Sequence, residues 1–383
     1  MKEWKTYKLG DIVNFTTGKL DSNAADINGK YPFFTCSPET LKINSFAFNQ
    51  KAILLAGNNA EGNFSVKYYE GKFNAYQRTY VISISDENVV DYKFLYYALK
   101  ICLLRFKMMS QGTSTKFLTK SILNSFEIDL PNIETQQSIA SILASIDSKI
   151  QINRQINDNL EQQAQTLYKS WFVDFEPFKD GYFVESELGL IPEGWEVRDI
   201  YKYTDVIYGA PYKSSLFNEN KEGYPLIRIR DLKSFAPQFY TQEILPQTEY
   251  IIAGDVVAGM DAEFTPYIWQ GEKGVLNQRC CKFKGQYPWV SNYYLLNLLK
   301  PELEYVQSYK TGTTVSHLGK ADIDRFKVIT PPESIVKTFS VIVNSLLEQK
   351  IKSAYEIRNL TSTRDSLLPK LMAGELKINE IDC

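Results

Sequence analysis

Sixteen polar side chains suited to contacting a charged polymer lie in two separate regions of the sequence. They are Asn58, Asn59, Lys72, Gln77, Arg78, Gln111, Thr113 and Lys116 in the first region, and Lys213, Arg228, Arg230, Lys273, Gln278, Arg279, Lys310 and Thr313 in the second. Such side chains hydrogen-bond to base edges in DNA and hold phosphate groups. Each one, taken singly, is better explained as an ordinary solvated residue, so residues that recur in both regions carry more weight.

Two short motifs do recur. Gln77-Arg78 in the first region matches Gln278-Arg279 in the second, and Gly112-Thr113 matches Gly312-Thr313. A Gly-Thr pair with a nearby lysine offers backbone N–H and hydroxyl groups to a phosphate. The same pair equally fits a turn that positions the segment after it.

Motifs for catalysis are missing from the sequence. The single histidine, His317, is more typical of a surface or core residue than of a catalyst, and the segment TPPE at 330–333 is not the Asn/Asp-Pro-Pro-aromatic motif of amino-methylation. We find no Gly-x4-Gly-Lys-Ser/Thr phosphate loop, no Gly-rich cofactor loop after a strand and no convincing carboxylate cluster for a metal. The sequence therefore favours a binding protein that holds no cofactor or metal of its own.

Overall charge and cysteine content narrow the class further. The 383 residues carry 43 basic and 45 acidic side chains, so a nucleic-acid face must be a local patch. The five cysteines are odd in number and show no CxxC spacing, which fits a reducing cytoplasm. We expect no signal peptide and no membrane span.

The candidate residues are placed by a stretch that occurs twice. Residues 112–172 and 312–372 align without a gap at an offset of 200, with eleven identities, among them Leu118/Leu318, Phe126/Phe326 and Leu167/Leu367. Each copy begins with a loop and a short strand that ends at Pro131 or Pro331. An internal repeat outranks other sequence signals, so we expect two similar units in one chain.

A long helix follows each strand. Its narrow apolar seam is of the coiled-coil kind, and from about Thr135 to Phe172 it would be roughly 55 Å long. The seam residues expected to pair the helices are Ile139, Ile142, Ile146, Asn153, Leu160 and Leu167 in the first copy and Phe339, Ile342, Leu346, Ser353, Leu360 and Leu367 in the second. Two such helices are marginal alone, so we predict that they pack antiparallel about an internal pseudo-two-fold axis.

Both seams carry a polar residue at the midpoint, Asn153 and Ser353. A buried polar residue at such a position fixes register and orientation at some cost in stability. The alternative is that the midpoints of both helices are solvated.

Two globular regions precede the helices, and the whole chain reads as an α+β fold. The expected segments are a first domain at 1–132, a helix at 133–172, a connector at 173–194, a second domain at 195–332, and a helix with tail at 333–383. Aromatic residues of the connector, Phe175, Phe178, Tyr182 and Phe183, are expected to lie against a surface. In the second domain, Ala258-Gly259 and Tyr293-Tyr294 are expected to correspond to Ala56-Gly57 and Tyr96-Tyr97.

The connector WFVDFEPFKDG…ESELGLIPEGWEV and the ending LLPKLMAGEL resemble the specificity subunit of type I restriction–modification systems, and the resemblance covers essentially the whole chain. It implies that each globular region is a target recognition domain that reads one half of a split, asymmetric DNA sequence. The two antiparallel coiled-coil helices would set the spacing and dock two modification (methyltransferase) subunits. It does not assign individual base contacts.

The resemblance also implies partners and cofactors. Restriction (translocase/nuclease) subunits would join the complex, and S-adenosylmethionine, ATP and Mg would belong to the partner subunits. Two other classes stay open: a coiled-coil scaffold with no role on DNA, and a stand-alone methyltransferase or nuclease. The absence of catalytic motifs argues against the second of these.

Overall fold

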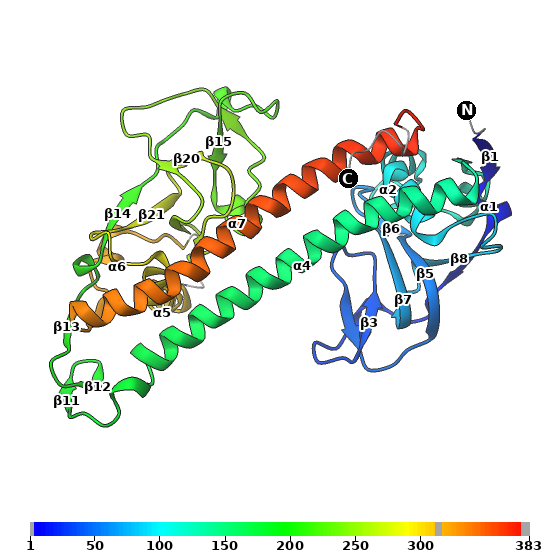
Figure 1. Cartoon of the computed structure of the whole chain (residues 1–383). Coiled ribbons are helices and arrows are strands. Elements are labelled where there is room, and N and C mark those ends of the chain that lie inside the picture. Colours follow the sequence, from blue (N-terminus) through cyan, green and yellow to red (C-terminus); the bar gives the residue numbers. More distant parts are fainter. Residues whose placement is uncertain (1–3, 311–315, 377–383) are drawn as a thin grey trace. The chain divides into compact units, whose positions relative to one another are not determined.

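The computed structural model describes residues 4–310 and 316–376 (Figure 1). It divides into two compact units: residues 1–149 with 360–383, and residues 150–359. Each unit contains one head of strands and short helices and parts of both long helices, α4 (Ile133–Phe172) and α7 (Glu333–Met372). Among the described residues, none of the helices combines the length and the hydropathy that a bilayer crossing needs.

The first head is the α+β part of the first unit. Its elements are β1 (Lys5–Lys8), α1 (Leu9–Ile12), β2 (Val13–Thr17), η1 (Ser22–Ala24), β3 (Tyr31–Phe34), β4 (Leu41–Ile43), β5 (Phe48–Ala56), β6 (Asn58–Asn59), β7 (Val66–Ala75), β8 (Thr79–Ile84), α2 (Tyr92–Met109), β9 (Lys116–Phe117), α3 (Lys120–Ser125) and β10 (Glu127–Leu130).

A six-stranded sheet in the order β2-β8-β5-β7-β3-β4 forms the body of this head. All its pairs are antiparallel except β3 with β7. Residues 52–56 of β5 are a continuous buried apolar run, as expected for a strand with both faces covered. Helix α2 packs on the sheet through a face that includes Phe94, Leu95 and Leu99, and Asp91 caps its N-terminus by accepting from the Phe94 N–H at 2.8 Å.

Polar contacts fasten the first head to the helices of its own unit. The buried Gln136 of α4 accepts from the Asp91 N–H at 3.0 Å and donates to the carbonyl oxygens of Val89 and Pro131. The Tyr97 hydroxyl of α2 donates to Asp147 of α4 at 2.7 Å. Burial and this hydrogen bond hold the pKa of Tyr97 well above its ordinary value, so the hydroxyl stays protonated and remains the donor.

The end of α7 in the same unit depends on a glycine. Gly374 follows the helix with φ +69, and its N–H donates to the Leu371 carbonyl at 3.2 Å. A Cβ at this position would lie 2.8 Å from the Trp4 indole nitrogen. Gly374 therefore serves both the left-handed turn and the close approach of Trp4.

Gly374→Ala is expected to destabilise the first unit by about 2–3 kcal/mol, because left-handed strain and overpacking add together. Gly189→Ala is the matched control, since its φ is +96 but nothing lies within 4 Å of an added Cβ. The control is expected to cost only about 1 kcal/mol. Calorimetry of each variant measures the difference, and equal losses would show that the Trp4 contact contributes nothing.

The second unit holds a connector and the second head. The elements are η2 (Glu176–Phe178), β11 (Phe183–Ser186), β12 (Gly189–Pro192), β13 (Glu196–Asp199), η3 (Ile200–Lys202), β14 (Thr204–Tyr208), η4 (Ser214–Leu216), β15 (Tyr224–Ile227), η5 (Ile229–Asp231), β16 (Tyr240–Thr241), β17 (Tyr250–Ile251), β18 (Val256–Gly259), β19 (Pro266–Ile268), β20 (Gly274–Leu276), β21 (Cys280–Gly285), α5 (Asn292–Lys310), α6 (Lys320–Ile323) and β22 (Lys327–Thr330).

The second head repeats the first with one broken strand. The place of β7 is taken by β19, which pairs with β18, and by β20, which pairs in parallel with β15 as β7 does with β3. The break at 269–273 is held by Trp269, whose indole N–H donates to the Glu272 carbonyl at 2.9 Å. Two four-stranded sheets, β14-β21-β18-β19 and β16-β15-β20-β17, therefore replace the single sheet of the first head.

Strand pairing corrects two of the expected correspondences between the heads. Ala56 pairs with Thr79 and Gly259 with Cys280, so Ala56 corresponds to Gly259 and not to Ala258. The Tyr pairs also differ, because the Leu95 N–H bonds to Asp91 and the Leu295 N–H to Ser291, which puts α2 and α5 at an offset of 200. Loops of unequal length before each helix produced the false matches.

The connector lies against the second head through only some of its aromatic residues. Phe175 and Phe178 pack edge-on against Trp195, with ring centroids 5.5 and 5.0 Å apart, and Phe183 contacts Phe175. Tyr182 is 82% exposed, so the expectation for this residue was wrong. Its neighbours supply enough apolar surface to hold the β11–β12 hairpin in place.

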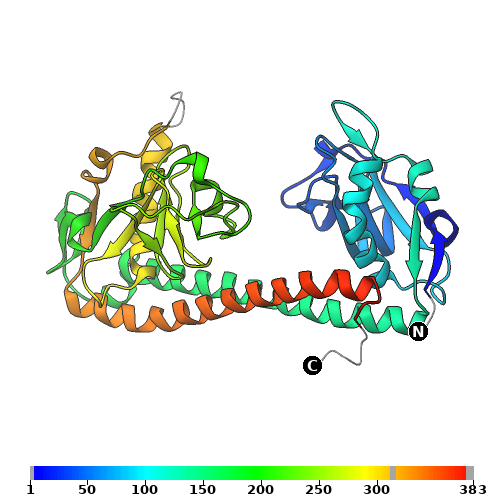
Figure 2. The same cartoon turned by 90° about the horizontal axis from the view of Figure 1, so that it is seen from above.

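In each unit α4 and α7 lie side by side and run antiparallel (Figure 2). In the first unit Ile139 and Leu143 pack in the cluster that holds Leu368 and Leu371. In the second unit Phe172 meets Phe339 with ring centroids 4.9 Å apart. The predicted seam residues lie as follows: Ile139, Leu160 and Phe339 are buried, Ile142, Ile146, Asn153, Leu167, Leu346, Leu360 and Leu367 are half-buried, and Ile342 is 41% exposed.

The seam is wider than the sequence pattern indicated. Ile342 was assigned to it wrongly, whereas its neighbour Val343 is fully buried. The reason is that each helix packs against a head as well as against the other helix, so its buried stripe covers more than two heptad positions. At the midpoint Ser353 is 7% exposed, and its hydroxyl donates to the Asn153 carbonyl at 3.2 Å. Ser353 is therefore not solvated.

Candidate nucleic-acid interface

Three loops of the first head meet at one edge, here called the first rim: residues 57–63, 76–78 and 111–118. The Gly57 N–H donates to the Arg78 carbonyl and the Leu118 N–H donates to the Gly57 carbonyl, both at 2.9 Å. Strand β6 of the first loop pairs with β9 of the third. Backbone hydrogen bonds thus bring together candidates that lie up to 60 residues apart in the chain.

The candidate side chains of the first rim differ in what they are free to do. Gln77, Arg78, Gln111 and Thr113 are exposed. Asn59 is occupied, because its side-chain oxygen accepts from the Glu61 and Asn63 N–H groups. The buried side-chain oxygen of Asn58 has no partner among the described residues. Lys116 is half-buried on β9. The exposed group is therefore the part of this rim that fits a ligand.

The second head has a corresponding second rim: residues 259–263, 277–279 and 316–318. The Met260 N–H donates to the Arg279 carbonyl at 2.8 Å, and the Leu318 N–H donates to the Met260 carbonyl at 2.7 Å. These are the same two contacts that Gly57 makes in the first rim. The repeat therefore extends from the long helices into the loops of the heads.

The two Gln-Arg turns are equivalent in detail. The Gln77 N–H donates to the Leu20 carbonyl and the Gln278 N–H to the Ala210 carbonyl, each at 2.9 Å. All four side chains of the two turns are exposed. Each turn thus presents an amide and a guanidinium to solvent from the same place in its head.

An acidic residue distinguishes the second rim, and the sequence did not single it out. Asp261 is ion-paired with Arg279 at 2.9 Å and contacts Nδ1 of His317 at 2.7 Å. His317 pairs with Asp261 as an isolated bridge, at the position that Phe117 occupies in the first rim. The corrected alignment places Asp261 opposite Asn58. Asp261 orients Arg279 and offsets part of the positive charge of the second rim.

Several other candidates have structural partners outside the rims. Arg228 pairs with the buried Asp231 at 3.1 Å and stacks on Phe239 at 4.4 Å. Lys310 bonds to Asp322 and to the His317 carbonyl, each at 2.6 Å. Lys72 and Lys273 are exposed but lie over the rings of Phe46 and Tyr250.

The last candidates of the second head are Lys213, Arg230 and Thr313. Lys213 and Arg230 are exposed on the loop before β15 and on η5. Thr313 lies outside the described residues. The structure therefore gathers only part of the predicted set into the two rims.

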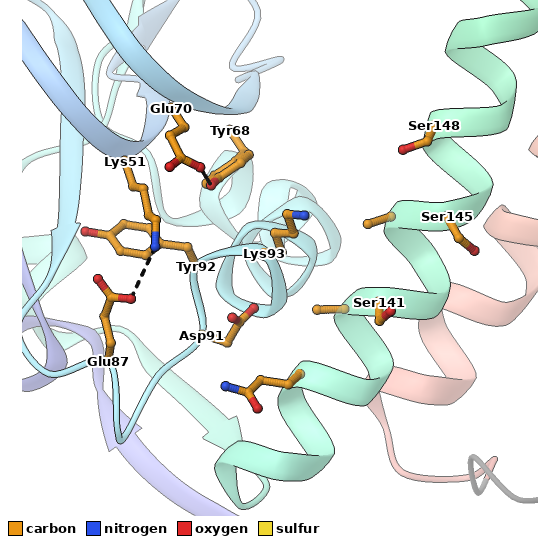
Figure 3. Close-up of a pocket in the computed structure, with 13 residues that line it drawn as sticks. Lys51, Tyr68, Glu70, Glu87, Asp91, Tyr92, Lys93, Ser141, Ser145 and Ser148 are labelled. Carbon is orange, nitrogen blue, oxygen red and sulfur yellow. Dashed lines mark hydrogen bonds and ion pairs between the residues drawn. The ribbon is translucent and has the colours of Figure 1, made fainter.

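A cleft of about 560 Å³ in the first unit is the other recess with charged walls (Figure 3). Its head side carries Lys51, Glu70, Glu87, Asp91 and Lys93, and its helix side carries small residues of α4, Ala140, Ser141, Ala144, Ser145 and Ser148. Three carboxylates against two ammonium groups give it a net negative charge. Such a surface repels phosphate, so the rims are the better candidates for nucleic acid.

The corresponding place in the second unit is closed. Strand pairing aligns Glu70 with Gln270, and Gln270 bonds to Asn157 of α4 at 3.2 Å and to Arg358 of α7. The same pairing aligns Lys51 with Gly254, where a Cβ would lie 2.9 Å from Ile351 of α7. The open cleft is thus a property of the first unit.

Within the described residues, no group of three or more His, Cys, Asp and Glu side chains is placed to hold a metal ion. The adjacent thiols of Cys280 and Cys281 are buried in the second head, and burial raises the pKa of Cys281 to about 12. A buried, protonated thiol is a core residue and not a nucleophile.

Comparison with known proteins gives one consistent result. A family model described as "Type I restriction modification DNA specificity domain" matches residues 1–162 and 192–355. The chain is 28% identical to the type I restriction enzyme EcoDI specificity subunit of Escherichia coli, over 98% of this chain and 89% of that protein. It is 30% identical to the MjaIX specificity subunit of Methanocaldococcus jannaschii, over 78% of this chain and 72% of that protein.

A solved structure supports the fold. The crystal structure of the type I restriction–modification S subunit from M. genitalium aligns with a TM-score of 0.60 at 18% identity, covering 96% of each chain. The fold class predicted from the sequence, two mixed α/β domains with long helices, is thereby confirmed.

Proposed function

The chain belongs to the type I restriction–modification DNA specificity family, and we propose that each of its heads reads one half of a bipartite, asymmetric DNA sequence. In this proposal the rims face the duplex and the unlike loops of the two heads determine the two half-sequences. The long helices set the gap between the halves. A gap of about one duplex turn, roughly 34 Å, suits helices of this length.

The observation that best supports the proposal is the pair of equivalent Gln-Arg turns. Both heads present the same two side chains on the same backbone hydrogen bonds, although most of their other loops differ. Residues common to both heads are unable to distinguish two different half-sequences. We therefore assign Arg78 and Arg279 to phosphate groups, which fix the position of each head without reading sequence.

The proposal includes partners and a division of labour. The chain itself is non-catalytic, while two modification subunits carry S-adenosylmethionine and restriction subunits carry ATP and Mg. Methylation of a base in a duplex requires the base to leave the stack, so a modification subunit must work beside each head. The negatively charged cleft of the first unit suits a protein partner better than DNA, because the small side chains on α4 permit close approach.

Arg78→Ala and Arg279→Ala are each expected to weaken DNA binding roughly tenfold in the complex with modification subunits, and equally for every sequence. Each loss of a phosphate contact also makes the plot of log K against log salt shallower by about one. Titrations of cognate and non-cognate duplexes at several salt concentrations measure both quantities.

Arg198→Ala is the matched control, since Arg198 is an exposed arginine of β13 that pairs with Glu196 outside the rims. It is expected to leave affinity and salt dependence unchanged. Loss of discrimination between sequences in Arg78→Ala or Arg279→Ala would show that these residues read bases. An effect equal to that of Arg198→Ala would remove the rims from the interface.

A further inference from the structure

Two ion pairs link the long helices, and both have the same polarity. In the first unit Asp147 of α4 pairs with Arg364 of α7 at 2.8 Å. In the second unit Glu161 of α4 pairs with Lys350 of α7. The basic side chains are the more buried partners, with 16% of Arg364 and 4% of Lys350 exposed. In both units the acid is on α4 and the base is on α7.

Both ion pairs belong to one antiparallel register. From Asp147 to Glu161 is a step of 14 residues forward along α4, and from Arg364 to Lys350 is a step of 14 residues back along α7. The contact of Phe172 with Phe339 follows the same rule, 11 residues farther on. The position opposite any residue of the seam is therefore known.

The repeat allows the same register to be applied to two identical helices. Because α4 and α7 align at an offset of 200, Arg364 corresponds to Ala164 and Lys350 to Ile150. Two copies of α4 would thus place Asp147 opposite Ala164 and Glu161 opposite Ile150. Two copies of α7 would place Arg364 opposite Leu347 and Lys350 opposite Thr361.

We propose that these two ion pairs make α4 select α7 and reject the like helix of a second copy of this chain. Apolar seam residues such as Leu143 and Val343 fit either arrangement, because their counterparts are also apolar. The charges do not, since a pairing of like helices leaves each of them without a partner in a partly or fully buried seam. Lys350 contributes most to the selection and the half-exposed Glu161 contributes less.

The selection concerns like helices only. An exchange of α7 between two copies would keep the same ion pairs. What is excluded is a symmetric dimer built from two first halves or from two second halves, which the internal repeat would otherwise permit. The inference does not depend on DNA binding.

Cleavage of the folded full-length protein tests the proposal. A protease site placed between Glu187 and Leu188, both exposed in the β11–β12 turn, gives fragments 1–187 and 188–383 that stay together. Exchange between isotope-labelled and unlabelled cleaved protein in moderate urea, followed by native mass spectrometry, counts the pairs that re-form. Unlike fragments are expected to outnumber like fragments at least tenfold. Unlike and like pairs in the 2:1:1 statistical ratio would overturn the proposal.

Charge variants separate selection from general stability. Arg364→Asp is expected to raise the share of like pairs several-fold, and Asp147→Arg added to it should return the share to the original value, because the pair is restored with reversed polarity. Lys370→Asp is the control, since Lys370 is exposed on α7 and carries the same change of charge. Failure of the double variant to recover, or an equal effect of the control, would contradict the assignment.

Discussion

Exchange of residues 1–110 for those of a relative is expected to change one half of the methylated DNA sequence completely and to leave the other half unchanged. The reason is that the loops of the first rim all belong to the first unit, and the second rim is built entirely from the second. Each rim is closed by its own backbone hydrogen bonds and needs no residue of the other head. Sequencing of methylated genomic DNA from cells with the modification subunits measures both halves.

The structure specifies how the exchange should be made. Tyr97 of the exchanged segment donates to Asp147, which is retained, and the retained Gln136 bonds to the backbone at Val89 and Asp91. The donor head must therefore supply a tyrosine at the position of Tyr97. A version with phenylalanine there is the control for poor anchoring, and it should lose activity without altering the sequence recognised. A change in both halves after the exchange would rule out one head for one half.

Lengthening the helix pair is expected to lengthen the gap between the two half-sequences. Insertion of four residues near Asn157 lengthens α4 alone, so the ion pairs of Asp147 and Glu161 with α7 are unable to form together in one register. We expect that variant to lose assembly. Insertion of seven residues into both α4 and α7, at positions opposite each other in the register, keeps the heptad phase.

The matched insertion adds roughly 10.5 Å to each helix at 1.5 Å per residue, which equals about three base pairs at 3.4 Å each. Methylated sites of this variant are expected to show the same half-sequences separated by about three more base pairs. An unchanged gap with full activity would show that the helices do not measure distance. Assembly of the four-residue variant with an unchanged gap would contradict the register as well.

The long helices and the fold class were predictable from the sequence because they rest on an ungapped repeat and a regular apolar period. The details of the seam were not. Ile342 has the spacing of a seam residue but lies on an exposed side of α7, while the adjacent Val343 is buried. A period alone does not show that a helix has two neighbours, the other helix and a head.

The heads were less predictable because their contacts join distant segments. The parallel pairing of β3 with β7, and the break of the equivalent strand at 269–273, leave no periodic signal. The Gln-Arg turns were found because the dipeptide recurs, whereas Asp261 was missed because no motif marks it. Arg228 was overestimated, although an acid three residues later, Asp231, is a spacing that favours a local ion pair.

Mapping of methylated bases in a genome that carries this gene and its modification partner tests the central claim most directly. The account predicts that all modified sites share two short defined sequences, unlike each other, separated by a constant number of unspecified base pairs. Modification of a single uninterrupted sequence, or of sites with a variable gap, would contradict the reading of one half by each head.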